Sequence, residues 1–265
     1  MASKINYQAF YRYSPQSYQD YIQPPSISIF FHERNKLFLK EFKKFKRKKE
    51  GVRVLDVGCG WGSSIFPLSE ISDKNDFFLG IDVNKHYVEF SENKAKAKKV
   101  KNAYFKRIDI SKQDWENQID GVFDIIIFSE TIEHLYPQDQ NNALKNISQK
   151  LAKDGILIIT CPNKNCLIKK VIKKSKEIPY FGKIINISLK GSVGHVAELS
   201  YSELRKKTSR YFDKVKQGGL TFSYGQNVLD RSTFTTLSFI FSNIFFRYLL
   251  PFWCFDQYII LKNKR

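Results

Sequence analysis

The stretch with the clearest capacity for chemistry is a glycine-rich run at residues 54–62, Val-Leu-Asp-Val-Gly-Cys-Gly-Trp-Gly. β-Forming residues lead into Asp56, and glycines then occupy every second position. Glycine accepts positive φ angles, and because it lacks a Cβ atom a ligand can approach its backbone closely. A strand, a tight turn and a helix N-terminus in this order direct free backbone N–H groups at a ligand. The run therefore predicts a nucleotide-binding corner.

The position of the carboxylate narrows the choice of ligand. A dinucleotide-binding turn reads G-x-G-x-x-G and holds a pyrophosphate, whereas a carboxylate placed just before the turn repels a pyrophosphate and attracts an ammonium group. The residues Asp56, Gly58, Gly60 and Gly62 resemble the first motif of the Rossmann-like (class I) S-adenosylmethionine-dependent methyltransferases. The resemblance implies that this loop, with Cys59, cradles the methionine half of S-adenosylmethionine, and that S-adenosylhomocysteine is the product.

Strands and helices alternate through the middle of the chain, which predicts an α/β, doubly wound, mostly parallel sheet with helices on both faces. The apolar run at 123–128 is typical of a strand buried on both sides of such a sheet. Two closing strands at the C-terminal end complete the seven-stranded sheet that the resemblance implies over residues 50–262. We expect strands at 53–57, 77–83, 103–110, 123–128, 156–161, 212–222 and 256–261, and helices at 28–49, 63–71, 85–99, 139–153 and 203–211.

A length of 265 residues leaves room for one α/β domain with a lid or insertion. We expect residues 1–50 to form an N-terminal arm and helix, and residues 51–265 to form the methyltransferase domain. Insertions are expected within that domain at 163–200 and 223–255. The tyrosine-rich stretch 1–25 is interpreted either as an aromatic lid over the cofactor or as a loosely docked arm.

Acidic residues end the second and third predicted strands, at the edge where open α/β sheets bind ligands. The resemblance implies that Asp82, next to Val83, accepts hydrogen bonds from both ribose hydroxyls; the alternative is an aspartate that caps the next helix. It also implies that Asp109 contacts the adenine amine while Ile110 packs on the adenine ring. The alternative for Asp109 is an ordinary turn.

The seven residues 129–135, Ser-Glu-Thr-Ile-Glu-His-Leu, follow the fourth predicted strand. They resemble the S-E-x-x-E-H-L stretch of the methyltransferase branch that modifies small molecules, quinones, sugars and lipids. The resemblance implies that Ser129 borders the cofactor and that Glu133 and His134 lie between cofactor and acceptor. An ordinary histidine pKa suits His134 to act as a general base near neutral pH. The alternative is a histidine that only orients the loop.

A second histidine stands beside a carboxylate, in the sequence Gly-His-Val-Ala-Glu at residues 194–198. His195, within reach of Glu198, is interpreted either as an oriented base or as a brace for its loop. Cys161 follows the fifth predicted strand, where RNA cytosine-5 methyltransferases carry a nucleophile. The Pro-Cys pair that those enzymes need is missing after the fourth strand, so we expect Cys161 to be a small strand-end residue.

The amino-acid composition indicates which classes of partner and which cellular compartment suit the chain. The chain carries 44 Lys plus Arg against 26 Asp plus Glu, a net charge of +18. This excess fits nucleic acid, anionic lipid or an acidic substrate, or a lysine-rich surface with no partner. The four cysteines show neither a disulfide framework nor zinc-ligand spacing, and the N-terminus has no signal-peptide pattern. We therefore expect no metal and a cytoplasmic location.

The segment 233–255 is strongly apolar but is interrupted by Asn243, Arg247 and Pro251. A transmembrane helix needs about 20 mostly apolar residues, which disfavours a membrane span. The alternatives are a lid helix packed on the core, or an amphipathic face that meets a membrane or a lipidic acceptor. In the second alternative the protein is cytoplasmic and also makes peripheral contact with a membrane.

The sequence thus predicts an enzyme that transfers a methyl group to an O or N atom of a small-molecule, glycan or lipid-linked acceptor. Two alternatives stay open. The first is an RNA acceptor, which the net charge favours and the missing base-modification motifs disfavour. The second is a cofactor-binding scaffold without turnover.

Overall fold

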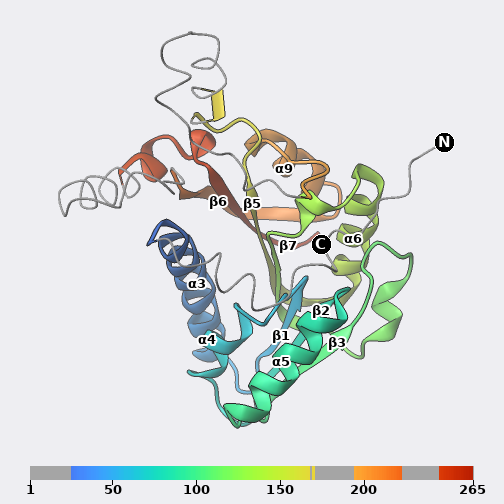
Figure 1. Cartoon of the computed structure of the whole chain (residues 1–265). Coiled ribbons are helices and arrows are strands. Elements are labelled where there is room, and N and C mark those ends of the chain that lie inside the picture. Colours follow the sequence, from blue (N-terminus) through green and yellow to red (C-terminus); the bar gives the residue numbers. More distant parts are fainter. Residues whose placement is uncertain (1–24, 168, 171–193, 223–244, 265) are drawn as a thin grey trace.

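The computed structural model describes residues 25–167, 169–170, 194–222 and 245–264. Within these residues seven strands form one sheet in the order β3-β2-β1-β4-β5-β7-β6 (Figure 1). Strands β1 to β5 run parallel, and β7 is antiparallel to its neighbours β5 and β6. The prediction of a doubly wound, mostly parallel seven-stranded sheet is confirmed. The strands are β1 (Arg53–Val57), β2 (Phe77–Asp82), β3 (Ala103–Arg107), β4 (Phe123–Ser129), β5 (Leu151–Pro162), β6 (Phe212–Thr221) and β7 (Asp256–Asn263).

Strand β1 marks the point where the strand order reverses, because β2 pairs on one side of it and β4 on the other. Open α/β sheets bind their ligands at the carboxyl ends of the strands beside such a point. The glycine-rich run follows β1 directly, Asp82 ends β2 and Ser129 ends β4. The topology therefore brings the main sequence-predicted site residues to one edge of the sheet.

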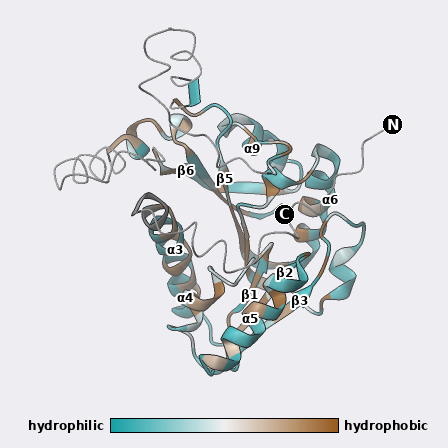
Figure 2. Cartoon of the chain, viewed as in Figure 1, coloured by the Kyte–Doolittle hydropathy of each residue, from teal (hydrophilic) through white to brown (hydrophobic). Residues whose placement is uncertain are grey.

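Helices cover both faces of the sheet, and the side chains of β4 alternate between them. Ile125 and Ile127 belong to one buried cluster, and Ile126 and Phe128 to the other. The first face carries α3 (Pro25–Lys46), α4 (Ile65–Ser69) and α5 (Lys85–Ala97), and the second carries α6 (Pro137–Lys150) and α9 (Tyr201–Thr208). Figure 2 shows the middle strands as hydrophobic, while much of the helical surface and β6 is hydrophilic.

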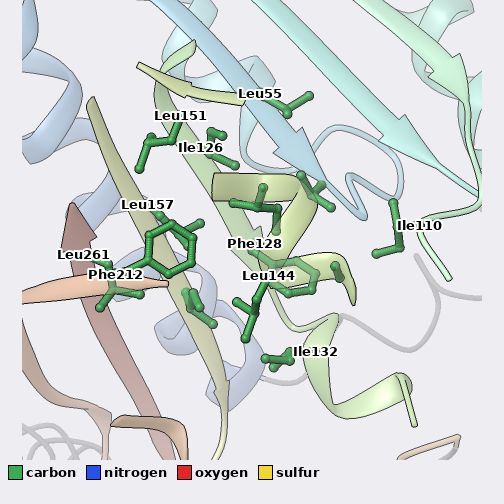
Figure 3. Close-up of a cluster of buried hydrophobic side chains, with 14 of the residues drawn as sticks. Leu55, Ile110, Ile126, Phe128, Ile132, Leu144, Leu151, Leu157, Phe212 and Leu261 are labelled. Carbon is green, nitrogen blue, oxygen red and sulfur yellow. The ribbon is translucent and has the colours of Figure 1, made fainter. Parts of the chain in front are cut away.

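The second cluster forms the larger part of the core below the site. Leu55, Ile126 and Leu157, from three adjacent strands, lie in this cluster with Leu144 of α6 (Figure 3). Its members are almost fully buried. Burial of such a side chain contributes about 1.5–3 kcal/mol to the stability of the fold. The strand ends that carry the site are therefore supported by a well-packed core.

The boundary between the fifth strand and the helix before it differs most from the prediction. The predicted helix 139–153 begins earlier, at Pro137, and ends at Lys150. Strand β5 then starts at Leu151 rather than at residue 156, because Leu151 pairs with Phe123 across an irregularity in the register. The start of β5 is therefore decided by pairing with β4, which the sequence around residue 151 does not reveal.

The third strand is shorter than predicted and ends at Arg107 instead of residue 110. The carboxylate of Asp109 accepts hydrogen bonds from the backbone N–H (3.0 Å) and the hydroxyl (2.6 Å) of Ser111. Such a local bond turns the backbone away from the strand. Asp109 therefore forms the turn that was its alternative interpretation, and its contact with adenine stays a prediction.

Several predictions concern residues outside the described ranges. The tyrosine-rich lid or arm at 1–24, most of the predicted insertion at 163–200, and residues 223–244 of the apolar segment all lie there. Among the described helices none has the length and apolar character that crossing a membrane requires. The domain division at residue 50 stays a prediction.

Candidate active site

The glycine-rich loop turns sharply at the end of β1. The backbone N–H groups of Gly58 and Cys59 donate to the carbonyl of Ile81 at 2.8 and 3.0 Å. Gly58 has φ +76°, and a Cβ there would lie 2.3 Å from Oγ1 of Thr131. Gly60 has φ +51°, and a Cβ there would meet nothing within 4 Å. Gly58 is therefore required by protein packing, whereas Gly60 leaves open space that a ligand can use.

Asp82 links this loop to the next helix. One oxygen of its carboxylate accepts from the N–H of Gly60 at 2.9 Å, and the other accepts from the N–H of Asn84 at 2.8 Å. Burial raises the pKa of Asp82, while these N–H bonds oppose the shift. The side chain that caps α5 is Asn84, which accepts from the N–H of His86. Asp82 keeps a second lone pair on each oxygen, so it can accept two further hydrogen bonds from a diol.

Asp56 is a buried carboxylate behind the loop, with an exposed fraction of 1%. One of its oxygens has no hydrogen-bond partner among the described residues. Burial raises the pKa of Asp56 to about 7, against the opposing effects of Arg34 and Ser64. Arg34 of α3 is itself buried and donates to the hydroxyl of Ser63 at 2.8 Å. A buried carboxylate with one oxygen that has no hydrogen-bond partner among the described residues fits a ligand with a cationic group.

Ser129 ends β4, Glu130 follows it directly, and both are held by β5. The hydroxyls of Ser129 and Thr160 lie 2.7 Å apart, and Thr160 also donates to the carboxylate of Glu130 at 2.8 Å. Glu130 adopts a left-handed backbone conformation, with φ 49°. A non-glycine residue in this region is strained by roughly 1–3 kcal/mol. The strain is offset by these bonds and by the one from the N–H of Glu130 to the carbonyl of Thr160.

The structure brings together two histidines that are far apart in the sequence. The ring centroids of His134 and His195 are 5.0 Å apart, with an angle of 72° between the rings. Nδ1 of His134 lies 3.1 Å from the carbonyl oxygen of Gly194, and Nδ1 of His195 lies 2.8 Å from the carboxylate of Glu198. A carbonyl oxygen and an ionised carboxylate can only accept, so Nδ1 of the histidine is the donor in both hydrogen bonds.

The backbone also joins these two segments. The carbonyl of Glu133 accepts from the N–H groups of Val196 (2.9 Å) and Ala197 (3.0 Å). The amide of Gln140 donates to the carbonyl oxygens of Ile132 and Ala197, both at 2.9 Å. The loop at 194–198 is therefore a fixed wall of the site.

The electrostatics of this cluster are dominated by burial. Burial, together with the nearby carboxylate of Glu130, raises the pKa of Glu133 well above its usual range. Burial lowers the pKa of His134 to about 4. The near-neutral pKa expected for His134 from sequence is therefore wrong, and His134 is a weak base. Hydrogen bonds from His195 and Lys169 outweigh the effect of burial and lower the pKa of Glu198 to about 2.

Other predicted site residues lie at the rim or in the core. The carbonyl of Val83 accepts from Arg107 at 3.1 Å, and Ile110 is buried in the core cluster. Cys161 is buried and burial raises the pKa of its thiol well above its usual range, as fits a small strand-end residue. Sequence reasoning missed Arg34, Thr160 and Lys169, because nothing in their local sequence marks them as neighbours of the site.

A cavity of about 830 Å³ lies elsewhere on the molecule. Its walls include Arg53 and Phe77, the first residues of β1 and β2, and Asn102, which precedes β3. It therefore opens at the opposite edge of the sheet and contains none of the predicted site residues. The chemistry described above lies at the carboxyl edge.

Comparisons with known proteins bear on this arrangement. A family model described as a methyltransferase domain matches residues 48–215. (S)-coclaurine N-methyltransferase of Papaver somniferum is 30% identical over 112 residues, which are 42% of this chain and 30% of that protein. Cyclopropane mycolic acid synthase 2 of Mycobacterium leprae is 30% identical over 137 residues, which are 48% of this chain and 43% of that protein. The matched stretch thus spans less than half the length of either relative.

The fold has a counterpart over its full length. The structure of magnesium protoporphyrin IX methyltransferase from Synechocystis PCC 6803 with bound SAM superposes with a TM-score of 0.59. The alignment covers 100% of each chain at 12% sequence identity. At this identity the likeness concerns the fold alone.

Proposed function

Because the chain belongs to the methyltransferase-domain family, we propose that it is an S-adenosylmethionine-dependent methyltransferase that acts on an O or N atom of a small-molecule, glycan or lipid-linked acceptor. One observation carries this proposal. Open space at Gly60 adjoins the carboxylate of Asp82, which lies near the buried Asp56, on the same edge as Glu133 and His134. When bound there, S-adenosylmethionine supplies an activated methyl group on a positively charged sulfur.

The chain's own residues account for binding. The buried carboxylate of Asp56 supplies negative charge for the cationic methionine half, and the backbone around Gly60 admits it without steric conflict. Asp82 is held rigidly by two N–H bonds and accepts the ribose hydroxyls with its remaining lone pairs. Preorganised groups of this kind lower the free-energy cost of aligning the methyl group with the acceptor. Such alignment makes the main contribution to the rate of a one-step displacement.

The acceptor end of the site is formed by the two histidines. In the metal-free protein His195 is the better candidate for the base, because the ionised Glu198 accepts a hydrogen bond from its ring and orients it. His134 is disfavoured by its low pKa. Base function of either histidine stays a prediction.

An exposed apolar surface near the same edge supports a lipidic or otherwise apolar acceptor. Tyr248, Leu249 and Phe252 are exposed large side chains. Asn163, which directly follows β5, donates to the carbonyl oxygens of Phe252 (2.9 Å) and Cys254 (3.0 Å). This tie holds the apolar surface at the carboxyl edge of the sheet. The excess of basic charge would help such a surface to meet anionic lipid, as part of a cytoplasmic protein in peripheral contact with a membrane.

Calorimetric titration with S-adenosylmethionine and S-adenosylhomocysteine tests the cofactor. We expect both to bind the wild-type protein, and Asp82→Asn to weaken both at least tenfold, since a hydrogen bond to a charged group contributes about 1.5–3 kcal/mol. Asp213→Asn, an exposed aspartate of β6, is the matched control and should bind as the wild type does. Equal affinity in wild type and Asp82→Asn would refute the ribose assignment, and no binding to folded protein would refute the function.

A further inference from the structure

We propose that Glu133, His134 and His195 form a binding site for a divalent transition-metal ion. One carboxylate oxygen and one nitrogen from each imidazole lie within 4.8 Å of one another. The sequence predicts no metal, because ligands that are contributed by two separate loops leave no recognisable spacing.

The first support is the state of Glu133. Its exposed fraction is 1%, and neither carboxylate oxygen has a hydrogen-bond partner among the described residues. Nε2 of His134 is 3.9 Å from Oε1, which is too long for a hydrogen bond. A buried carboxylate without partners is strongly destabilising unless it is protonated or faces a cation. A metal ion between the two imidazoles supplies that cation.

The second support is the orientation of the two histidines. Nδ1 of His134 donates to the carbonyl of Gly194, and Nδ1 of His195 donates to the carboxylate of Glu198. Metal-binding histidines almost always donate their other ring N–H to a carbonyl or carboxylate, which fixes the tautomer and orients the ring. Lys169 in turn holds Glu198 at 2.6 Å. With both Nδ1 atoms engaged in this way, a metal would be bound through Nε2 of each ring.

The distances and ligand types indicate the class of metal. Two ligands of one ion lie about 3.0–4.2 Å apart when each bond is about 2.1 Å long. Contraction from the present separations, which reach at most 4.8 Å, is within the reach of side-chain adjustment. Two imidazoles and one carboxylate suit Zn²⁺, Co²⁺ or Fe²⁺ better than Mg²⁺ or Ca²⁺, which favour oxygen ligands. Three protein ligands leave a coordination position for water or an acceptor.

The location gives the metal a role that rests on the proposed function. A metal at the acceptor end would bind a hydroxyl of the acceptor and lower its pKa, which favours an oxygen acceptor over nitrogen. The hydroxyl proton passes to water, and an electron pair of the oxygen forms a bond to the methyl carbon. The carbon–sulfur bond breaks with its electron pair going to sulfur, which leaves a neutral thioether. With metal bound, His195 acts as a ligand and not as the base.

Titration of chelator-treated full-length protein with cobalt(II) chloride, followed by visible absorption and calorimetry, tests the site. We expect one Co²⁺ per chain, with affinity at least tenfold weaker in Glu133→Gln and in His195→Gln. His86→Gln is the matched control, because His86 and Glu89 form an exposed pair on α5 with 3.8 Å between their side-chain atoms. Unchanged affinity in the two ligand variants, or no binding of Co²⁺ to folded wild type, overturns the proposal.

A measurement on the wild-type chain covers the case in which a ligand variant does not fold. The chain contains 4 histidines. Zinc chloride should shift the imidazole NMR signals of His134 and His195 and leave those of His32 and His86 in place; the reverse pattern contradicts the site. Binding of S-adenosylmethionine is measured separately on the same samples. Cofactor binding without metal binding would refute only the metal site. Metal binding without cofactor binding would refute the proposed function.

Discussion

Asp56 shows how one residue can serve binding at the expense of folding. Its carboxyl is almost completely buried, and its pKa is raised from 3.8 to about 7. A shift of about three pH units corresponds to a cost on the order of 4 kcal/mol for folding with the group ionised. A cationic ligand recovers part of that cost when it binds. The residue is therefore a poor choice for stability and a good one for attraction of a positive charge.

The first prediction follows from this linkage. An acid whose pKa is raised on folding stabilises the protein fully below its unfolded pKa, and that stability is lost as pH rises through the folded pKa. For Asp56 this window runs from about pH 4 to about pH 7. Asp56→Asn should therefore gain stability relative to wild type as pH rises from 4 to 8, by an amount on the order of 4 kcal/mol at most, while it loses cofactor affinity.

Urea denaturation at several pH values measures this difference. Glu133 and Asp256 also have raised pKa values but act equally in both proteins, whereas Asp82 repels Asp56 and its contribution changes with the substitution. Asp213→Asn serves as the control, and its free energy of unfolding should change with pH in parallel with that of the wild type. Parallel curves for Asp56→Asn as well would show that Asp56 is not neutralised on folding.

The two glycines of the loop give a second prediction at the same scale. Gly60→Ala places its Cβ in open space, so it should cost only about 1–2 kcal/mol for the left-handed conformation but should obstruct the cofactor. Gly58→Ala meets Thr131 at 2.3 Å and should lose more stability. Thermal denaturation and cofactor titration of both variants separate the effects. Normal cofactor affinity in folded Gly60→Ala would contradict the assigned position of the ligand.

At the scale of elements, helix α9 anchors the loop that carries His195. Ser200 accepts from the N–H of Glu203, and the carboxylate of Glu203 accepts from the N–H of Ser200 at 2.8 Å, which together make a capping box. This pairing satisfies two N–H groups at the start of the helix. The loop at 194–198 therefore depends on the stability of the helix that follows it.

Ser200→Ala tests this dependence. The loss of an N-cap costs about 1 kcal/mol, and we expect this decrease in the free energy of unfolding from chemical denaturation. Ser209→Ala, an exposed serine whose hydroxyl donates to the carbonyl of Lys206, is the control and should change stability by less than about 0.5 kcal/mol. A cost for Ser200→Ala no larger than that of the control would show that the capping box is not formed.

The elements also explain what the sequence could and could not predict. The glycine-rich run, Asp82 and the strand alternation are local patterns, and their placement at one edge follows from the topology of parallel sheets. The contact between His134 and His195 depends instead on hydrogen bonds from Val196 and Ala197 to the carbonyl of Glu133. The low pKa of His134 likewise arises from burial, which residue type alone does not reveal.

At the scale of the whole molecule, basic charge and an exposed apolar surface occur together. The net charge is +18, and exposed large apolar side chains gather between residues 245 and 253. Arg247 forms an ion pair with Glu33 of α3, which holds this surface against α3. Contact with an anionic lipid surface would use both properties.

Sedimentation with anionic phospholipid vesicles tests this contact. We expect the wild-type protein to bind, with affinity that falls as salt rises, and Leu249→Ser to bind at least fivefold more weakly. Leu249 is 58% exposed, and Val122→Ser, at a residue that is 49% exposed near the opposite edge, is the control. Equal binding by both variants would argue against a role for the apolar surface.

The position of β7 has a consequence for biosynthesis. This strand is translated after β6, yet it lies between β5 and β6 and pairs with both. While a ribosome is still making residues 256–263, β6 has no antiparallel partner and the edge of β5 is uncovered. An open strand edge of this kind is a site for mispairing between chains. The nascent protein therefore cannot complete its sheet until β7 has left the exit tunnel, and this interval is when a chaperone would matter most.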